Sequence, residues 1–361
     1  MGSVAMTDVW VLLLGGLVCG VLAGAAAQYG RLCTFSAIED AVMAGDFRRG
    51  RAFFLSLATA LLATQTLAST QLIDVSGNPY QHPQVELAGL IIGALLFGFG
   101  MSLVGTCGFG LLIRAGTGDL RALVTAIVLG IAAAASTGGL LAPLRLWTAG
   151  LVTVPTQTLG WENVQQISRE TLGLPANSVL TVLIVMAALG LIFRSARFRK
   201  RPQLIVAGVV LGLAVTSGWI VTSALTDPFG INRSESLTFV GPLARVVLLT
   251  MGETIHSAMF AVGSVLGVAS GSFAVAGMRD ELRWEAFDDP REMRRHLLGA
   301  VLMGLGGVLT KGCTIGQGLS AASTLAVTAP IAIVFMIQGA SIGLSYLVGD
   351  HEAFSLWPKA R

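Results

Sequence analysis

Long apolar stretches alternate with short polar ones along almost the whole chain. Stretches of about 20 apolar residues recur throughout, and that length lets an α-helix cross the hydrocarbon layer of a bilayer. The pattern predicts an all-α integral membrane protein. We expect about nine transmembrane helices, at about residues 9–27, 52–72, 86–106, 121–141, 178–195, 203–224, 246–276, 296–311 and 325–348.

Composition supports this fold class and narrows the partners. Hydrophobic residues make up 54% of the 361 residues and charged residues only 12%, whereas an average soluble domain is about 25% charged. The 45 glycines suit tightly packed or interrupted membrane helices. The chain has no basic tail and no interleaving of basic and aromatic residues, so we expect the lipid bilayer and no nucleic acid as a partner.

The distribution of basic residues predicts an orientation. Most Lys and Arg of the short loops fall in residues 45–51, 193–201 and 279–295, and such loops face the cytoplasm. With nine spans, this places the N-terminus outside and the C-terminus in the cytoplasm.

An internal repeat becomes visible when Cys107 is aligned with Cys313. "IIGALLFGFGMSLVGTCGFG" and "LLGAVLMGLGGVLTKGCTIG" then share four glycines. The first stretch runs inward and the second outward, so the two copies have inverted topology. We expect a single transporter domain with a first repeat at about 9–141, a connector span at about 178–195 and a second repeat at about 203–348. Such folds bind substrate near the midplane, where interrupted helices meet.

Both copies interrupt their apolar stretch with a glycine and a cysteine followed by further glycines, as Gly-Thr-Cys in the first copy and Lys-Gly-Cys in the second. Non-helical backbone at membrane depth is tolerated only inside the protein or beside a polar cavity, and freed N–H groups at the start of the next helix favour an anion. The alternative is packing glycines with an inert thiol. Because the breaks occur at matched positions, we favour a functional role for Cys107 and Cys313.

The other two cysteines differ from each other. Cys19 lies in the middle of the first span and is expected to pack there, whereas Cys33 follows Arg31 at the end of that span. The second-half segment 226–242 has no cysteine at the corresponding place. Without a CxxC motif or a Cys/His cluster, we expect no metal site, no cofactor and no structural disulfide.

Charged residues near the breaks are candidates for anion binding. Lys311 precedes Cys313 on the outer side, Arg114 follows Cys107 toward the cytoplasm, and Arg31 precedes Cys33. Each can attract an anion or serve as an interfacial anchor, and the sequence leaves both open. Glu253 and His256, one turn apart, can form a structural pair or relay a proton.

Three motifs, "GRLCTFSAIEDAV", "GFGMSLVGTCGFGLLIRAGTG" and "LMGLGGVLTKGCTIGQGLSAAS", together resemble the YeeE/YedE family of bacterial inner-membrane proteins. The resemblance implies an hourglass-shaped inverted repeat with short re-entrant helices, uptake of thiosulfate without enzymatic activity, and Cys33, Cys107 and Cys313 as path-lining residues. It also implies, for some members, a cytoplasmic sulfur-carrier partner of the TusA type.

The thiols suit such a path on chemical grounds. A neutral S–H is a weak donor, so a series of them can replace part of an anion's hydration without holding it tightly. We expect these thiols to be protonated, because a thiolate would repel the anion. Thr106 and Lys311 depart from the family's usual residues at the constriction. The alternatives are a membrane thiol or persulfide redox protein, or a transporter of a selenium or other sulfur species.

Overall fold

The computed structural model describes residues 6–75, 78–81, 84–154, 177–225, 234–252 and 259–349. Within these ranges the chain is helical apart from connecting turns and one short antiparallel pair of strands, β1 (Val85–Glu86) and β2 (Thr153–Val154). The all-α membrane fold expected from the hydropathy pattern is confirmed.

Long and short helices occur in both halves of the chain. The first half contains α1 (Met6–Gly30), α2 (Thr34–Ala44), α3 (Arg48–Ser69), α4 (Leu87–Val104), α5 (Gly108–Gly116), α6 (Leu120–Gly138) and α7 (Ala142–Leu151). The connector consists of α10 (Asn177–Phe193) and α11 (Ala196–Arg199). The second half contains α12 (Pro202–Ser223), α13 (Val240–Thr250), α14 (Met259–Met278), α15 (Pro290–Leu309), the π-helical turn η2 (Gly316–Ala321) and α16 (Thr328–Val348).

The expected count of nine spans is not confirmed. Seven described stretches are long and apolar enough to cross a membrane. The expected spans at 178–195 and 296–311 correspond to α10 and α15, and both fall short for a physical reason. The α10 helix has only 17 residues, and the first two turns of α15 carry the charged run from Arg291 to Arg295.

The expected span at 246–276 is wrong in its extent. The structure places the short helix α13 before Met251 and begins the long helix α14 only at Met259. Gly252 adopts a left-handed conformation with φ +92°, which an α-helix cannot continue through. Glu253 and His256, the expected polar pair, lie outside the described residues.

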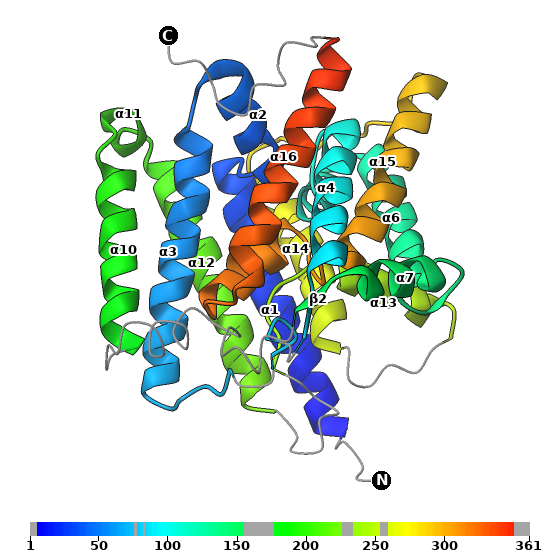
Figure 1. The fold of residues 1–361 in the computed structure, drawn as a ribbon. Helices are drawn as coiled ribbons and strands as arrows, with labels where there is room; N and C mark the ends of the chain where they lie inside the picture. Colours follow the sequence, from blue (N-terminus) through cyan, green and yellow to red (C-terminus); the bar gives the residue numbers. More distant parts are fainter. Residues whose placement is uncertain are drawn as a thin grey trace.

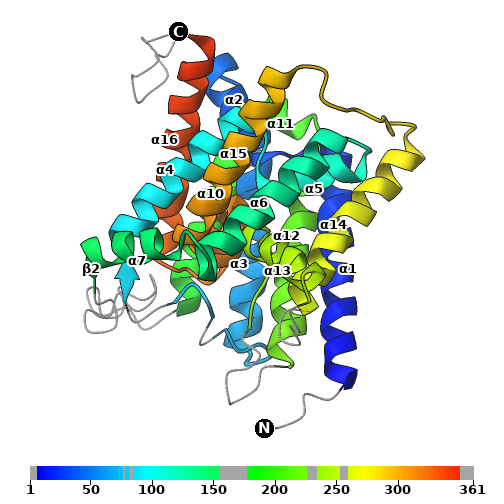
Figure 2. The same ribbon diagram turned by 90° about the vertical axis from the view of Figure 1, so that its right-hand side faces the viewer.

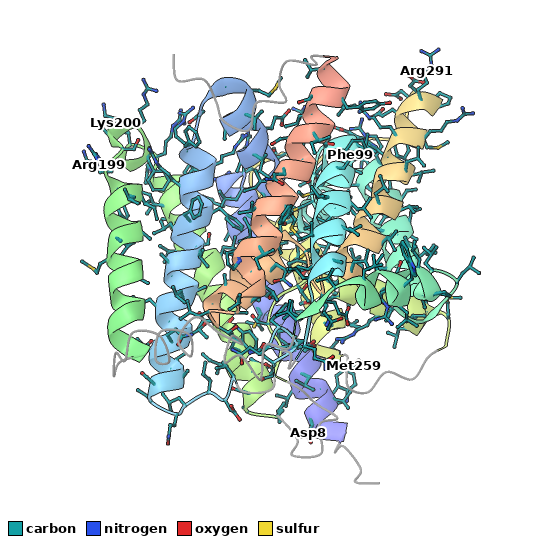
Figure 3. All side chains as sticks on the ribbon, viewed as in Figure 1. Asp8, Phe99, Arg199, Lys200, Met259 and Arg291 are labelled. Atoms are coloured by element: carbon teal, nitrogen blue, oxygen red, sulfur yellow. The ribbon has the colours of Figure 1, made fainter. Side chains whose placement is uncertain are left out.

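The two ends of the bundle differ in charge. Figure 1 shows that α1 begins at one end of the molecule and α16 finishes at the other. Figure 3 places Arg199, Lys200 and Arg291 at the same end as the last turn of α16, and Asp8 at the end where α1 begins. We call the end with Arg199, Lys200 and Arg291 the basic face, and the end where α1 begins the opposite face.

Long helices from the two halves pack against each other in matched pairs. The α1 helix packs along α14, as α12 packs along α3. Likewise α4 packs along α16, as α15 packs along α6, while α4 and α15 cross each other (Figure 2). Exchanging α1 with α12, α3 with α14, α4 with α15 and α6 with α16 therefore reproduces the packing.

Glycines shared by the two aligned stretches make this crossing close. A Cβ built on Gly100 would lie 2.7 Å from the carbonyl oxygen of Gly299, and one built on Gly299 would lie 2.8 Å from that of Gly100. Gly306 meets the carbonyl of Gly93 in the same way, at 2.5 Å. Any side chain at these positions would push α4 and α15 apart. The glycines therefore determine how close the two chain breaks lie, since one break follows α4 and the other follows α15.

Candidate functional site

Three chain breaks share one backbone design. The residue two positions before each cysteine is left-handed: Arg31 has φ +51°, Gly105 has φ +78° and Lys311 has φ +55°. Such a residue ends the preceding helix and redirects the chain. A new helix then starts after the cysteine, at Thr34, at Gly108 and at Thr314.

This design costs free energy where the left-handed residue is not glycine. A side chain in that region is disfavoured by about 1 kcal/mol relative to glycine. The chain nevertheless has cations at two of the three positions, Arg31 and Lys311. The presence of Arg31 and Lys311 at these positions agrees with a role for their positive charge that offsets the backbone free-energy cost.

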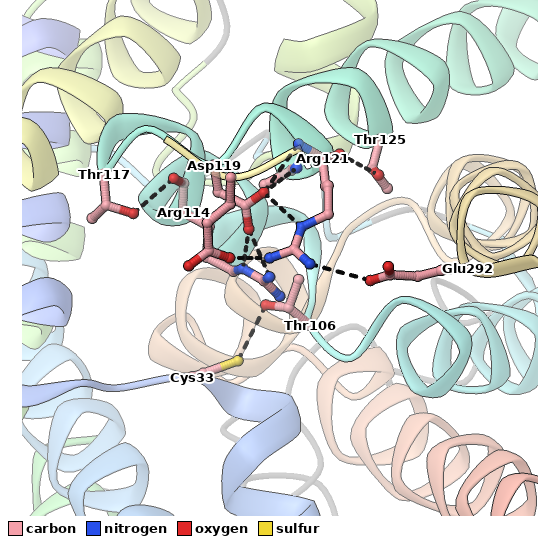
Figure 4. Close-up of polar contacts among 10 residues, drawn as sticks. Cys33, Thr106, Arg114, Thr117, Asp119, Arg121, Thr125 and Glu292 are labelled. Carbon is pink, nitrogen blue, oxygen red and sulfur yellow. Dashed lines mark hydrogen bonds and ion pairs between the residues drawn. The ribbon is translucent and has the colours of Figure 1, made fainter. Parts of the chain in front are cut away.

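The thiols of the first half lie together. The Cys33 thiol is adjacent to that of Cys107 and within hydrogen-bonding distance of the Thr106 hydroxyl, at 3.3 Å (Figure 4). Cys107 is fully buried, whereas Cys33 is partly exposed. The structure thus brings together two predicted site residues that are 74 positions apart in the sequence.

Cys313 is the centre of the second half. It is fully buried, its sulfur accepts a hydrogen bond from the Gly316 backbone N–H at 3.4 Å, and it lies 3.8 Å from the Thr238 hydroxyl. A hydroxyl pair links the two halves, because Thr34 Oγ1 lies 3.1 Å from Thr314 Oγ1. Thr34 also lies beside Cys107, and Thr314 directly follows Cys313 in the chain.

A cavity of about 540 Å³ leads from the basic face to Cys33 and Thr106. Its lining includes four arginines: Arg31, Arg49, Arg114 and Arg283. This volume is large enough for a small hydrated anion, and the excess of positive charge favours one.

Three of these arginines are paired with carboxylates, and Arg49 contacts Asp40 at 2.9 Å. Arg31 donates to Glu281 at 2.8 Å, and this contact holds the pKa of the Glu281 carboxyl below its usual range. Arg114 makes a two-pronged contact with Asp119, at 2.6 and 2.9 Å. Figure 4 shows this contact next to Arg121, which also reaches Asp119. Both predicted cations line the cavity, but each is partly neutralised.

The third predicted cation, Lys311, lies on the other side of the cysteines. It lines a small cavity of about 20 Å³ together with Tyr80 and Glu86, room for about one water molecule. The Lys311 ammonium lies 3.7 Å from a carboxylate oxygen of Glu86. The cavity on the side of Lys311 is therefore much smaller than the one that opens at the basic face.

Cys19 stands apart from these groups. It is buried between α1 and α12, where the Ser217 hydroxyl donates to its sulfur at 3.1 Å, in agreement with a packing role. All four cysteines are free thiols. Within the part of the chain that the structure describes, no three His, Cys, Asp or Glu residues are placed to hold a metal ion.

Sequence reasoning missed the hydroxyl groups near the thiols. Thr34-Phe35 and Thr238-Phe239 are matching dipeptides of the two halves, and each threonine lies beside the central cysteine of its half. That match was a usable signal for Thr238. No comparable signal identifies Tyr80, because it comes from a loop outside the aligned stretches.

Comparison with known proteins places this arrangement in a family. The profile of a family described as Sulphur transport matches residues 29–342. A protein of Escherichia coli (strain K12) named thiosulfate transporter TsuA is 27% identical over 349 residues, which cover 91% of this chain and 92% of that protein. A Spirochaeta thermophila protein of the same name is 26% identical, with coverage of 90% and 96%. The matched region contains all three cysteine breaks, and the chain thus belongs to the Sulphur transport family, the YeeE/YedE family that its motifs resemble.

Proposed function

We propose that this protein is a transporter that imports thiosulfate along a path lined by Cys33, Cys107 and Cys313. The observation that carries the proposal is the placement of the three thiols at chain breaks between two cavities that open toward opposite faces. The printed names of the two relatives supply the substrate class. A doubly charged anion with a soft terminal sulfur matches a series of weak, polarisable S–H donors.

The residues divide the work along the path. Lys311 draws the anion to the narrow cavity, and the protonated Cys313 and Cys107 thiols then replace part of its hydration in turn. Cys33 passes it into the wide cavity, where Arg31 and Arg114 attract it without binding it tightly, because Glu281 and Asp119 already offset their charge. Binding at each step is strong enough to admit the anion and weak enough to release it.

The architecture we propose for this path is the inverted repeat, with halves at about 9–141 and 203–348 and a connector at about 178–195. The matched packing pairs and the reciprocal contacts of Gly100 and Gly299 support it. Two related halves that meet at interrupted helices are the usual construction of a midplane binding site.

We also propose an orientation in the bacterial inner membrane. The basic face, with the clustered arginines and lysine, would lie in the cytoplasm, since cytoplasmic loops carry the excess of Lys and Arg. The N-terminus would then be outside and the C-terminus inside. Transport from the Lys311 side to the wide cavity is import in this orientation.

A cytoplasmic sulfur carrier of the TusA type is the partner we propose for the wide cavity. The support is the size and positive charge of that cavity, from which a carrier could receive the anion. A pull-down of the full-length protein with such a carrier, with and without thiosulfate, tests this partner.

One observation favours a second candidate function. The adjacency of Cys33 and Cys107 is the arrangement that a thiol redox protein needs, although the two cysteines are far apart in the sequence. In that case the pair would cycle between dithiol and disulfide with an external two-electron acceptor and donor, or a thiolate would attack the sulfane sulfur of thiosulfate and form a persulfide as sulfite leaves. The family assignment favours transport, without a catalytic reaction, as the primary function.

Uptake into proteoliposomes separates the two candidates. The purified protein is reconstituted, and entry of ³⁵S-thiosulfate is measured for wild type and for Cys33→Ser, Cys107→Ser and Cys313→Ser, with Cys19→Ser as the matched control. We expect at least tenfold slower uptake for Cys107→Ser and Cys313→Ser and little change for Cys19→Ser. A wild type that moves no label while its thiols form a disulfide would refute the transporter. Competition by selenium anions or sulfite against the label identifies another preferred substrate.

A further inference from the structure

The two halves of the path are chemically unequal. In the first half the Cys33 thiol stands against Gly110, since a Cβ built on that glycine would lie 3.4 Å from Cys33 Sγ. Gly316 is the matching glycine of the second half. At the position in the second half that matches Cys33 in the sequence, before Thr238-Phe239, the chain has the fully buried Leu237. The repeat itself thus provides no donor there.

A side chain from outside the aligned stretches fills this place. A Cβ built on Gly316 would lie 3.2 Å from the hydroxyl of Tyr80, nearly the separation between Gly110 and the Cys33 thiol. Tyr80 is only 4% exposed, and its hydroxyl lies beside that of Thr238, which in turn contacts Cys313. The Tyr80 hydroxyl is therefore the positional counterpart of the Cys33 thiol.

The loop that carries Tyr80 is built to hold it there. The Asn78 side-chain oxygen accepts from the backbone N–H groups of Tyr80 and Gln81, at 2.9 and 3.1 Å, and its amide nitrogen donates to Val75 at 2.8 Å. Gln81 reaches the carbonyl of Thr324, just after η2, at 3.4 Å. Asn78 is 2% exposed. Such a buried, closed set of contacts fixes a turn, so the hydroxyl has a defined position.

We propose that Tyr80 is a further anion-binding residue, the fourth donor of the path, located between Lys311 and Cys313. This inference rests on the proposed function and adds a binding group to it. Tyr80 lines the narrow cavity with Lys311 and lies beside the Thr238 hydroxyl at its buried end. An anion that has been drawn to Lys311 meets the phenol before it meets a thiol.

The chemistry of the phenol suits this first position. An O–H is a stronger hydrogen-bond donor than an S–H, and an anion arriving from water must exchange full hydration for protein contacts. Hydroxyl donors favour the sulfonate oxygens of thiosulfate, whereas the thiols deeper in the path accommodate its terminal sulfur. We therefore assign recognition of the oxygens to Tyr80 and Thr238.

Removal of one oxygen atom tests the proposal. Tyr80→Phe keeps the ring and its packing. Tyr346→Phe is the matched control, because Tyr346 lies in the last turn of α16 and is 71% exposed. A hydrogen bond to a charged group is commonly worth about 1.5 kcal/mol or more, which is roughly tenfold in affinity. We expect Tyr80→Phe to raise the KM for ³⁵S-thiosulfate uptake about tenfold, with the thermal unfolding temperature unchanged, and Tyr346→Phe to leave the KM unchanged.

Thr238 supplies a second, independent variant. Thr238→Val, which removes the neighbouring hydroxyl, should raise the KM, and Thr238→Ser, which keeps it, should not. Wild-type KM values in both Tyr80→Phe and Thr238→Val would overturn the proposal. Faster uptake by Tyr80→Phe would also overturn it, because the hydroxyl would then be an obstruction and not a donor. Absence of uptake by wild type would instead refute the proposed function, so the two failures are distinguishable.

Discussion

Substitution of Lys311 tests whether a cation at the narrow end of the proposed path attracts the anion. Replacement by glycine should change stability and uptake differently. The left-handed backbone of Lys311, φ +55°, favours glycine by about 1 kcal/mol. The ion pair with Glu86 spans 3.7 Å between side chains that are 34% and 31% exposed, and such a pair is worth about 0.5 kcal/mol. We expect Lys311→Gly to be as stable as wild type, or more stable by about 0.5 kcal/mol.

Uptake should weaken nevertheless. Two unit charges 4 Å apart in water attract each other by about 1 kcal/mol, so a dianion gains about 2 kcal/mol from the Lys311 ammonium. Repulsion from Glu86 is the same in wild type and in the variants, so it does not change the difference between them. A loss of about 2 kcal/mol corresponds to roughly a thirtyfold higher KM for Lys311→Gly and Lys311→Ala. Lys311→Arg should retain the wild-type KM, and Glu86→Gln should lower it.

The assay is the initial rate of ³⁵S-thiosulfate uptake over a range of concentrations, at 0.1 M and 1 M inert salt, with thermal unfolding of each variant in detergent. The screening length falls from about 10 Å to about 3 Å between these salt concentrations, so the difference between wild type and Lys311→Gly should shrink at high salt. Equal KM values for wild type and both neutral variants would refute the attraction and leave Lys311 only as a partner of Glu86.

Three further predictions concern the frame around the path. Gly306→Ala should lower the free energy of unfolding by about 1–3 kcal/mol, because its Cβ would approach the α4 backbone to 2.5 Å. Gly190→Ala is the control and should have no such effect, since Gly190 faces open space. Equal unfolding temperatures for the two variants would contradict the close crossing of α4 and α15. Asp119→Ala should cost about 3 kcal/mol in chemical denaturation, because the buried Asp119 carboxylate caps α6 and contacts the partly exposed Arg114 and Arg121. The pKa of Glu281 is depressed, so its pairing with Arg31 stabilises the fold above the unfolded glutamate pKa of about 4.3. This stabilisation is lost as the pH falls from there through the lower folded pKa. The difference in unfolding temperature between wild type and Glu281→Gln should stay constant from pH 8 to 5.5 and shrink as the pH falls below about 4.3.

The sequence predicted the helical frame well, because each buried span needs its own apolar stretch and the shared glycines need close neighbours. Gly100 and Gly306 were identified as a matched set and lie at the α4–α15 crossing. The error at 246–276 arose because the apolar residues of α13 and α14 run together in the sequence. Hydropathy records where residues are apolar, not where the backbone turns.

The candidate site was predictable only in part. Cys33, Cys107 and Cys313 stand out because they follow similar breaks, but the partners of Arg31 and Lys311 do not. Those carboxylates are about 250 and 225 positions away in the chain, as the separations of the paired residues show, and only tertiary packing brings them together. The left-handed backbone of Arg31 and Lys311 could not be predicted from the sequence either, because glycine is the residue that usually indicates such a conformation.

The unequal depth of the two cavities determines where the membrane voltage acts. Water in the cavity of about 540 Å³ carries the potential of the basic face inward as far as Cys33 and Thr106, so most of the voltage falls across the short closed stretch that includes Cys313. With the basic face in a negatively charged cytoplasm, as proposed, a dianion crossing that stretch inward climbs about 4.6 kcal/mol per 100 mV. Import therefore needs either rapid removal of thiosulfate on the cytoplasmic side or the entry of compensating positive charge with it.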